Sequence, residues 1–184
     1  MLHSGLLYPD GRNPVPFFKA LARLKASGVI DAKNLQVVLR ASGFESTYAQ
    51  EAQRLDIDDI VTLAPPVSNR DALIEQASAD ALLLFQGSKF DRQIPAKLYE
   101  YLRIGRPIFA LVGEHGETAQ TLRDTGSAQP VPLEDADKIQ ACLAAFIADV
   151  RGGRAFRVRP DLVAAYSRRE GAAFLAKMLD ELTD

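Results

Sequence analysis

Two polar loops, each leading into a helix that begins near a proline, hold the residues of this sequence that could do chemistry. The first loop covers residues 5–14 and the second covers residues 86–97. A proline is tolerated in the first turn of a helix, where its missing N–H costs nothing. Backbone N–H groups at a helix N-terminus favour an anion, and nearby cations strengthen that preference. The cations of the two loops are Arg12, Lys89, Arg92 and Lys97, and Ser88 adds a hydroxyl in the second loop. If the fold brings the loops face to face, they would suit a diphosphate.

Glu100 lies three residues after Lys97 in the helix that is expected over residues 95–105. This spacing allows two interpretations. Lys97 and Glu100 could form a surface ion pair, worth at most about 0.5 kcal/mol. Alternatively, the Glu100 carboxylate could accept hydrogen bonds from the hydroxyls of a ligand such as a ribose. The spacing alone leaves both open.

The apolar pattern predicts six short strands that alternate with helices. The strands are expected at residues 2–8, 35–39, 60–63, 81–85, 108–112 and 128–131. Helices are expected from the Asn13 cap to residue 28, from the Ser46 cap to residue 55, after the Ser68 cap, and at residues 95–105, 118–124, 138–150 and 166–182. In the helix after Ser68, the residues Leu73, Ile74 and Ala77 are expected on the inner face. This alternation predicts an α/β fold, a doubly wound, parallel, six-stranded sheet of Rossmann type, in one domain over residues 1–184.

The expected strand order brings the two loops together. In a Rossmann sheet of order 3-2-1-4-5-6, strands 1 and 4 are neighbours, and the loops after them flank one crevice. The chain has no G-x-G-x-x-G after its first strand, no Walker A sequence and no G-x-S-x-G elbow. His3 is expected to be a structural residue of a buried strand, and His115 to line the crevice. Neither a catalytic triad nor a metal site is predicted.

Composition narrows the class of protein. The chain has 184 residues, of which 47% are hydrophobic and 25% charged, and a formal net charge of −2. Such a balance gives no reason to expect nucleic-acid binding. The single cysteine, Cys142, excludes an internal disulfide and is expected in the core. Neither a membrane span nor a signal peptide is visible, which indicates a cytoplasmic setting.

Three segments carry a resemblance to a known family. They are HSGLLYPDGRNP, ASADALLLFQ and IPAKLYEYLRIGRPIFAL, and the pattern P-x-K-L-Y-E-Y-L-x-x-G-x-P in the last is the most specific part. Over nearly its whole length the chain resembles the carboxyl-terminal domain of a GT-B glycosyltransferase of the retaining group called family 4, or group 1. The resemblance implies a six-stranded Rossmann-like sheet that holds a nucleotide-sugar donor at its carboxyl edge.

The resemblance also implies roles for particular residues. Gly5 would lie where the backbone approaches the donor, Arg12 and Lys97 would contact the diphosphate, and Glu100 would bind the ribose hydroxyls. Ser88 and Lys89 would complete the donor-binding set. Arg12 and Lys97 would be catalytic because they stabilise the departing nucleoside diphosphate. Neither a cofactor nor a metal is implied, and the nucleotide-diphosphate sugar is a substrate.

Two positions depart from the family pattern. The first glutamate of the two-glutamate motif falls at Arg92, and a second basic position near the first strand falls at Leu6. The chain also begins abruptly at its first strand. We therefore expect a piece of a longer two-domain protein, inactive alone, whose missing N-terminal domain holds the acceptor, including one at a membrane surface. Two alternatives stay open: a non-catalytic ligand-sensing or interaction domain, or a nucleotide-sugar epimerase-like half.

Overall fold

A parallel sheet of six strands forms the centre of the molecule. The computed structural model describes residues 1–155 and 158–182. The strands are β1 (Leu2–Ser4), β2 (Val37–Arg40), β3 (Val61–Ala64), β4 (Leu82–Gln86), β5 (Ile108–Val112) and β6 (Pro130–Val131). They pair in the order β3-β2-β1-β4-β5-β6, and all five neighbouring pairs are parallel. This is the predicted doubly wound, Rossmann-like α/β fold, with its switch point between β1 and β4.

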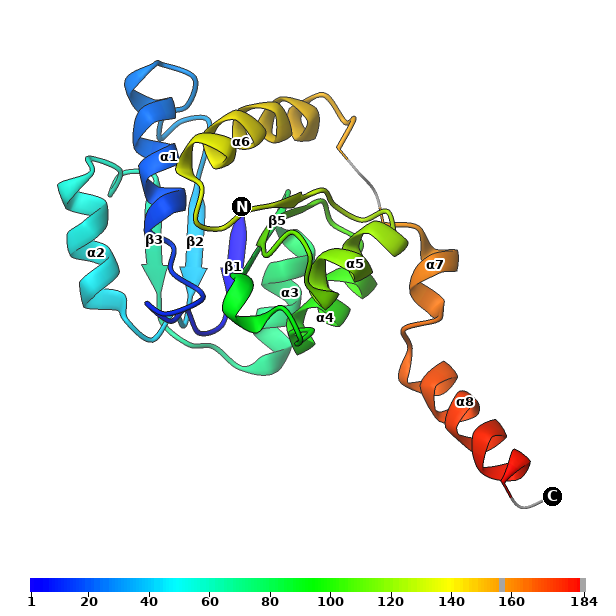
Figure 1. Ribbon diagram of the computed structural model, residues 1–184. Coiled ribbons are helices and arrows are strands. Elements are labelled where there is room, and N and C mark those ends of the chain that lie inside the picture. The colour runs from blue at the N-terminus through cyan, green and yellow to red at the C-terminus, as the bar shows by residue number, and fades with distance from the viewer. Residues whose placement is uncertain (156–157, 183–184) are drawn as a thin grey trace.

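Helices cover both faces of the sheet (Figure 1). They are α1 (Val15–Ala26), α2 (Glu45–Arg54), α3 (Asn69–Ser78), α4 (Ala96–Ile104), α5 (Glu117–Asp124), α6 (Ala136–Arg151), α7 (Pro160–Ala164) and α8 (Arg168–Glu181), with one short 3-10 turn, η1 (Ser88–Phe90). Side chains of α1, α2 and α6 share one hydrophobic cluster, and those of α4 and α5 share the cluster on the opposite face. The strands β4 and β5 lie between these clusters, and every residue in them is buried. This two-sided burial explains why their sequences are continuous apolar runs rather than alternating ones.

Several element boundaries differ from the sequence prediction. The first strand ends at Ser4 rather than at residue 8, because Gly5 has a φ of +120° and turns the chain out of the sheet. Asn13 was expected to cap the first helix, whereas Pro14 holds the cap position and the Asn13 Oδ1 accepts a hydrogen bond from the Val15 N–H at 3.0 Å. The last strand is limited to Pro130–Val131, and the sequence pattern missed η1 and α7.

The helix α3 faces the sheet with a different side from the predicted one. Leu73 and Ile74 are 40% and 54% exposed, whereas Gln76 is buried. The neighbouring Glu75 receives two hydrogen bonds from Arg40 at the end of β2, at 2.8 and 2.6 Å. This bidentate pair holds α3 with its polar side inward, so the prediction of an apolar inner face was wrong. Cys142 is likewise exposed on α6 rather than in the core.

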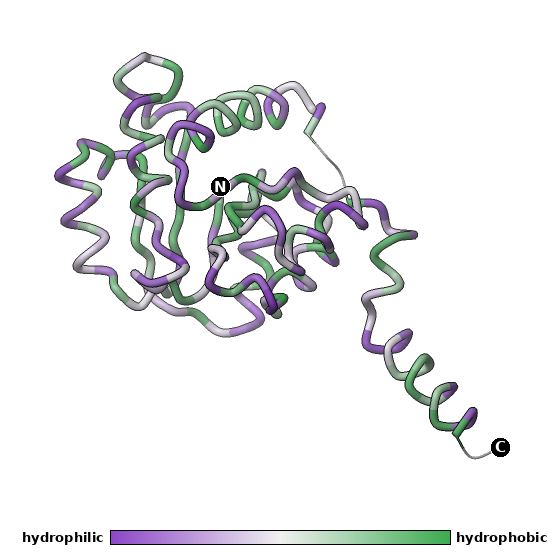
Figure 2. The backbone as a smooth tube through the Cα atoms, in the orientation of Figure 1, coloured by the Kyte–Doolittle hydropathy of each residue, from purple (hydrophilic) through white to green (hydrophobic). Residues whose placement is uncertain are grey.

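The helix α8 projects away from the body of the molecule (Figure 1). None of its described residues is buried, and apolar and polar residues alternate along it (Figure 2). Its large exposed apolar side chains are Phe174, Leu175, Met178 and Leu179. Within the described ranges, no helix combines the length and the apolar character needed to cross a membrane.

The start of α6 provides a test of the fold. The Asp135 Oδ1 accepts hydrogen bonds from the N–H groups of Asp137 and Lys138 at 3.1 and 3.0 Å, and α6 packs against α1. Replacing Asp135 with Ala removes this cap and should lower the free energy of unfolding by about 1 kcal/mol. Chemical denaturation monitored by circular dichroism measures the change. Asp135→Asn is the matched control because its side-chain oxygen still accepts, so a loss equal to that of the alanine variant would contradict the capping role.

Candidate functional site

The strands β1 and β4 separate almost as soon as they meet. Their only register pair in the sheet is Leu2 with Leu82, and the Leu2 N–H donates to the Ala81 carbonyl at 3.0 Å. One further rung of a parallel ladder would bring the Ser4 N–H onto the Leu83 carbonyl. That rung is replaced, so the sheet opens at its carboxyl edge between these two strands.

Two side chains take the place of the missing rung. The Leu83 carbonyl accepts a hydrogen bond from His3 Nδ1 at 2.9 Å, and the Ser4 N–H donates to the Tyr101 hydroxyl at 3.3 Å. Both His3 and Tyr101 are fully buried. Burial raises the pKa of Tyr101, so its phenol stays protonated and uncharged. Buried backbone groups therefore keep partners although the strands diverge.

Lys97 extends from the first turn of α4 over the end of β1. Its Nζ lies 3.1 Å from His3 Nε2. A Cβ atom placed on Gly5 would lie 2.8 Å from the same Nζ, so a glycine at this position leaves the space that the ammonium occupies. The structure thus brings together two of the residues selected from the sequence, Gly5 and Lys97, and joins His3 to them.

The surroundings of Lys97 make it an unusual lysine. Burial, and after it the positive charge of Arg12, lower the pKa of Lys97 to about 8, and the charge of Glu100 opposes this shift. Burial and then the Lys97 charge hold the pKa of His3 well below its usual value, so the imidazole is neutral. An anion bound next to Lys97 and Arg12 would compensate for the lost hydration of the Lys97 ammonium and would reduce the repulsion between the two cations.

Arg12 is held in place by aromatic rings and by one amide. Its guanidinium carbon lies 5.5 Å from the centre of the Tyr8 ring and 5.1 Å from that of Phe90. Its Nη2 donates to the Gln86 Oε1 at 2.8 Å, while its Nε is buried with no hydrogen-bond partner in the structure. Arg12 is therefore held by specific contacts and is not a free arginine on an exposed loop. The guanidinium is oriented and keeps donor capacity for a ligand.

Gln86 is the residue of this site that sequence reasoning missed. It closes β4 and is buried. Its amide nitrogen donates to the Gln93 carbonyl at 2.7 Å and to the Thr118 hydroxyl at 3.2 Å, which turns the amide oxygen toward Arg12. A single polar residue ending the apolar run ALLLFQ was the available signal, because a buried amide needs partners.

The two predicted loops do lie side by side. The Gly87 N–H donates to the Gly11 carbonyl at 2.7 Å, and Lys89 forms an ion pair with Asp10. Ser88 and Lys89 are exposed on η1, and the Lys89 charge is partly compensated by Asp10. They lie in the same loop as Phe90, which contacts Arg12, but within the described part of the chain neither of them hydrogen-bonds Lys97. Their predicted role in donor binding stays a prediction.

Glu100 and Arg92 are both exposed and take no part in the hydrogen bonds described above. Among the described residues no salt bridge joins Glu100 to Lys97, because the Lys97 side chain turns toward His3. The surface ion pair allowed by the spacing is therefore not formed. Next to Arg92, the Asp91 carboxylate packs against Gly113 in the loop after β5. In that loop, His115 is exposed.

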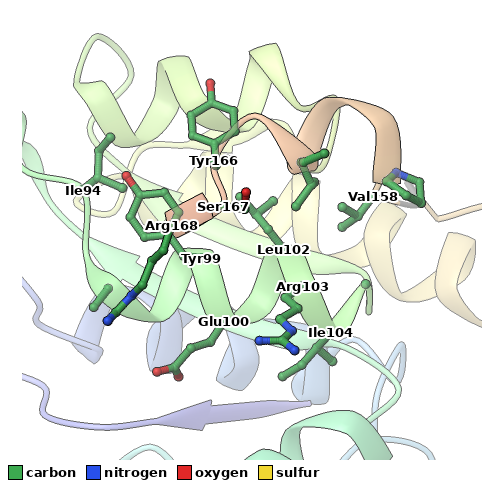
Figure 3. A pocket seen from close by; sticks show the side chains of 15 residues that line it. Ile94, Tyr99, Glu100, Leu102, Arg103, Ile104, Val158, Tyr166, Ser167 and Arg168 are labelled. Atoms are coloured by element: carbon green, nitrogen blue, oxygen red, sulfur yellow. The ribbon is translucent and has the colours of Figure 1, made fainter. Parts of the chain in front are cut away.

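A separate groove of about 1200 Å³ runs along the outer side of α4. Figure 3 shows Glu100 and Arg103 at one end of it and Tyr166 at the other. The rings of Tyr99 and Tyr166 lie 6.3 Å apart, and most of the remaining lining is aliphatic. Of the residues predicted for the donor site, Glu100 alone lines this groove. Within the described residues there is no cluster of three or more potential metal ligands.

Comparison with known proteins identifies the fold but not the family. No protein-family model matches the sequence, and no curated protein matches it. Among solved structures, sucrose-phosphate synthase from Thermosynechococcus elongatus superimposes with a TM-score of 0.61 at 15% identity, over 98% of this chain and 45% of that one. The pneumococcal O-GlcNAc transferase, solved in complex with UDP and GlcNAc, superimposes with a TM-score of 0.56 at 17% identity, over 96% of this chain and 34% of that one. A variant of the Thermobaculum terrenum O-GlcNAc transferase superimposes with a TM-score of 0.54 at 17% identity, over 98% of this chain and 35% of that one.

These three similar structures are glycosyltransferases, and this chain has the fold of the carboxyl-terminal, Rossmann-like half of a GT-B enzyme. The chain spans between a third and a half of the length of each neighbour. Identities of 15 to 17% establish a shared fold and nothing finer.

The lowered pKa of Lys97 is directly measurable. The Lys97 ammonium should titrate near pH 8, followed through its ¹³Cε resonance and assigned with the Lys97→Met variant. The unfolded chain binds the proton up to a pKa near 10.5, so between about pH 8 and 10.5 it binds more protons than the folded chain. The contribution of Lys97 to the free energy of unfolding should therefore rise with pH across this window. A Lys97→Met variant whose pH profile of stability matches that of the wild type would contradict the assignment.

Proposed function

We propose that this chain binds a nucleotide-diphosphate sugar and is the donor-binding half of a glycosyltransferase. The observation that carries the proposal is the convergence of Lys97 and Arg12 at the opened edge between β1 and β4. Arg12 comes from the loop after β1 and Lys97 from the first turn of α4, yet the Arg12 charge is near enough to lower the pKa of Lys97. Two cations held together at low hydration favour a polyvalent anion.

The chemistry follows from where these charges lie. Breaking the bond between a sugar and a nucleoside diphosphate leaves negative charge on the diphosphate, and Lys97 and Arg12 would stabilise that charge as it develops. Gly5 would let the donor approach the backbone. Glu100, free of any ion pair with Lys97, would accept hydrogen bonds from the ribose hydroxyls.

The structural neighbours support this class of reaction. All three are glycosyltransferases, and one was solved in complex with UDP and GlcNAc. Because this chain spans less than half of each of them, we propose that the acceptor is held by a further domain on the N-terminal side of this chain. The P-x-K-x-x-E segment, from Pro95 to Glu100, favours the retaining group of family 4.

Calorimetric titration with UDP, GDP, ADP and inorganic pyrophosphate tests the proposal. At least one nucleoside diphosphate should bind. Lys97→Met and Arg12→Ala should each weaken both that nucleotide and pyrophosphate by about tenfold or more, because each removes a charge-assisted contact to phosphate. Glu100→Gln should weaken the nucleotide but not pyrophosphate, which has no ribose.

Arg151→Ala is the matched control for these variants. Arg151 ends α6 and donates to the Asn34 carbonyl ahead of β2, at the opposite edge of the sheet. Its removal deletes one positive charge and should leave every affinity unchanged. If none of the nucleoside diphosphates binds to the wild-type chain, the proposed function is wrong.

A further inference from the structure

His3 is fixed by specific contacts at both of its ring nitrogens and on its ring. It is fully buried in β1, its Nδ1 bonds the Leu83 carbonyl at 2.9 Å, and its ring packs edge-on against Phe85 with centroids 5.1 Å apart. The remaining ring nitrogen, Nε2, faces Lys97 Nζ at 3.1 Å. Both ring nitrogens are therefore engaged: Nδ1 bonds the Leu83 carbonyl, Nε2 faces Lys97, and the backbone of Gly5 also interacts with the ring.

The direction of these hydrogen bonds follows from the chemistry of the partners. A carbonyl oxygen can only accept, so Nδ1 carries the proton. The ring is neutral because burial and the Lys97 charge oppose a second proton, which leaves a lone pair on Nε2. An ammonium can only donate, so Lys97 donates to Nε2. The interruption of the β1–β4 ladder thus determines which tautomer faces Lys97.

We propose that His3 is a positioning residue, whose imidazole holds the Lys97 ammonium over Gly5 with its other N–H bonds free for the diphosphate of a donor. This inference rests on the proposed function for the identity of the anion. It assigns a role to a strand residue that would not itself touch the ligand. Without the acceptor at Nε2, nothing else in the described structure hydrogen-bonds the Lys97 ammonium.

The same arrangement makes the affinity for an anion depend on the protonation of Lys97. The charged or titratable groups around Lys97 are His3 from β1, Arg12 from the loop after β1, and Glu100 from α4. Tyr101, also on α4, stays neutral and bonds Ser4. Above pH 8 the free protein loses the Lys97 proton, and an anion must bring it back. Affinity for the anion should therefore fall as the pH rises through about 8, a range in which a terminal phosphate with a pKa near 6 is already fully ionised.

Two conservative variants separate the functions of the two ring nitrogens. His3→Asn places an amide near Nδ1, so it can still donate to Leu83 but has nothing to offer Lys97. His3→Gln reaches the Nε2 position and supplies an acceptor there. Calorimetry with UDP and with pyrophosphate between pH 7.5 and 9.5 compares them with the wild type. We expect His3→Asn to weaken both ligands by about tenfold and His3→Gln to retain most of the wild-type affinity.

A double-mutant cycle distinguishes positioning from packing. In a Lys97→Met background, His3→Asn should cause no further loss, and the pH dependence should be absent. Equal losses in both backgrounds would overturn the inference, as would wild-type affinity in the His3→Asn single variant. Thermal unfolding of each variant identifies any general loss of stability.

The failure of the proposed function would look different. A wild-type chain that binds pyrophosphate but no nucleotide would refute the donor site while the His3 cycle could still be completed with pyrophosphate. In the free protein, the ¹³Cε titration of Lys97 supplies a readout that needs no ligand. His3→Asn should lower its midpoint, because the ammonium stays dehydrated and loses its acceptor. An unchanged midpoint would also overturn the inference.

Discussion

The early separation of β1 from β4 is the constraint on which the site depends. Parallel strands normally satisfy each other's backbone groups along their length, but these two share one register pair. The released groups sit in a buried region where an unpaired N–H or C=O is costly. His3 and Tyr101 satisfy them, and this requirement places an imidazole and a phenol at the switch point of the sheet.

In the resulting site, two positively charged side chains are held in fixed orientations although their charges repel each other. The guanidinium of Arg12 is oriented by two aromatic rings and by Gln86, which is itself fixed by Gln93. Lys97 is oriented by His3. Holding two cations near each other at low hydration costs free energy, and the lowered pKa of Lys97 expresses that cost. Sites that bind anions commonly carry such a cost in the free state and recover it when the ligand enters.

Apolar surface lies on elements outside the two hydrophobic clusters. Leu73 and Ile74 are exposed on α3, and α8 presents Phe174 and Met178 without a buried residue of its own. A helix of this length has little stability without tertiary packing. At its start, the Ser167 hydroxyl caps α8 by accepting a hydrogen bond from the Glu170 N–H. The groove beside α4 adjoins the beginning of this helix.

The alternation of strands and helices, the parallel sheet and the two loops at its switch point could all be predicted from the residues alone. Apolar runs and prolines report these features because burial and backbone geometry act locally along the chain. Gly5, Arg12 and Lys97 could be selected from the sequence because their residue types suit an anion and because the chain resembles a glycosyltransferase domain. The apolar pattern predicted less well which side of a helix faces the sheet. In α3, the bond from Arg40 to Glu75 holds the polar side inward, and Ile74 is exposed.

Which side chains contact one another depends on the packing of distant segments. Lys97 could pair with Glu100 one turn away, yet it bonds His3, which lies 94 residues earlier in the chain. Gln86 became part of the site because its amide is the acceptor that Arg12 reaches across the opened edge. Neither contact follows from spacing along the sequence. Both depend on where two strands stop pairing and on which polar groups must then be satisfied away from water.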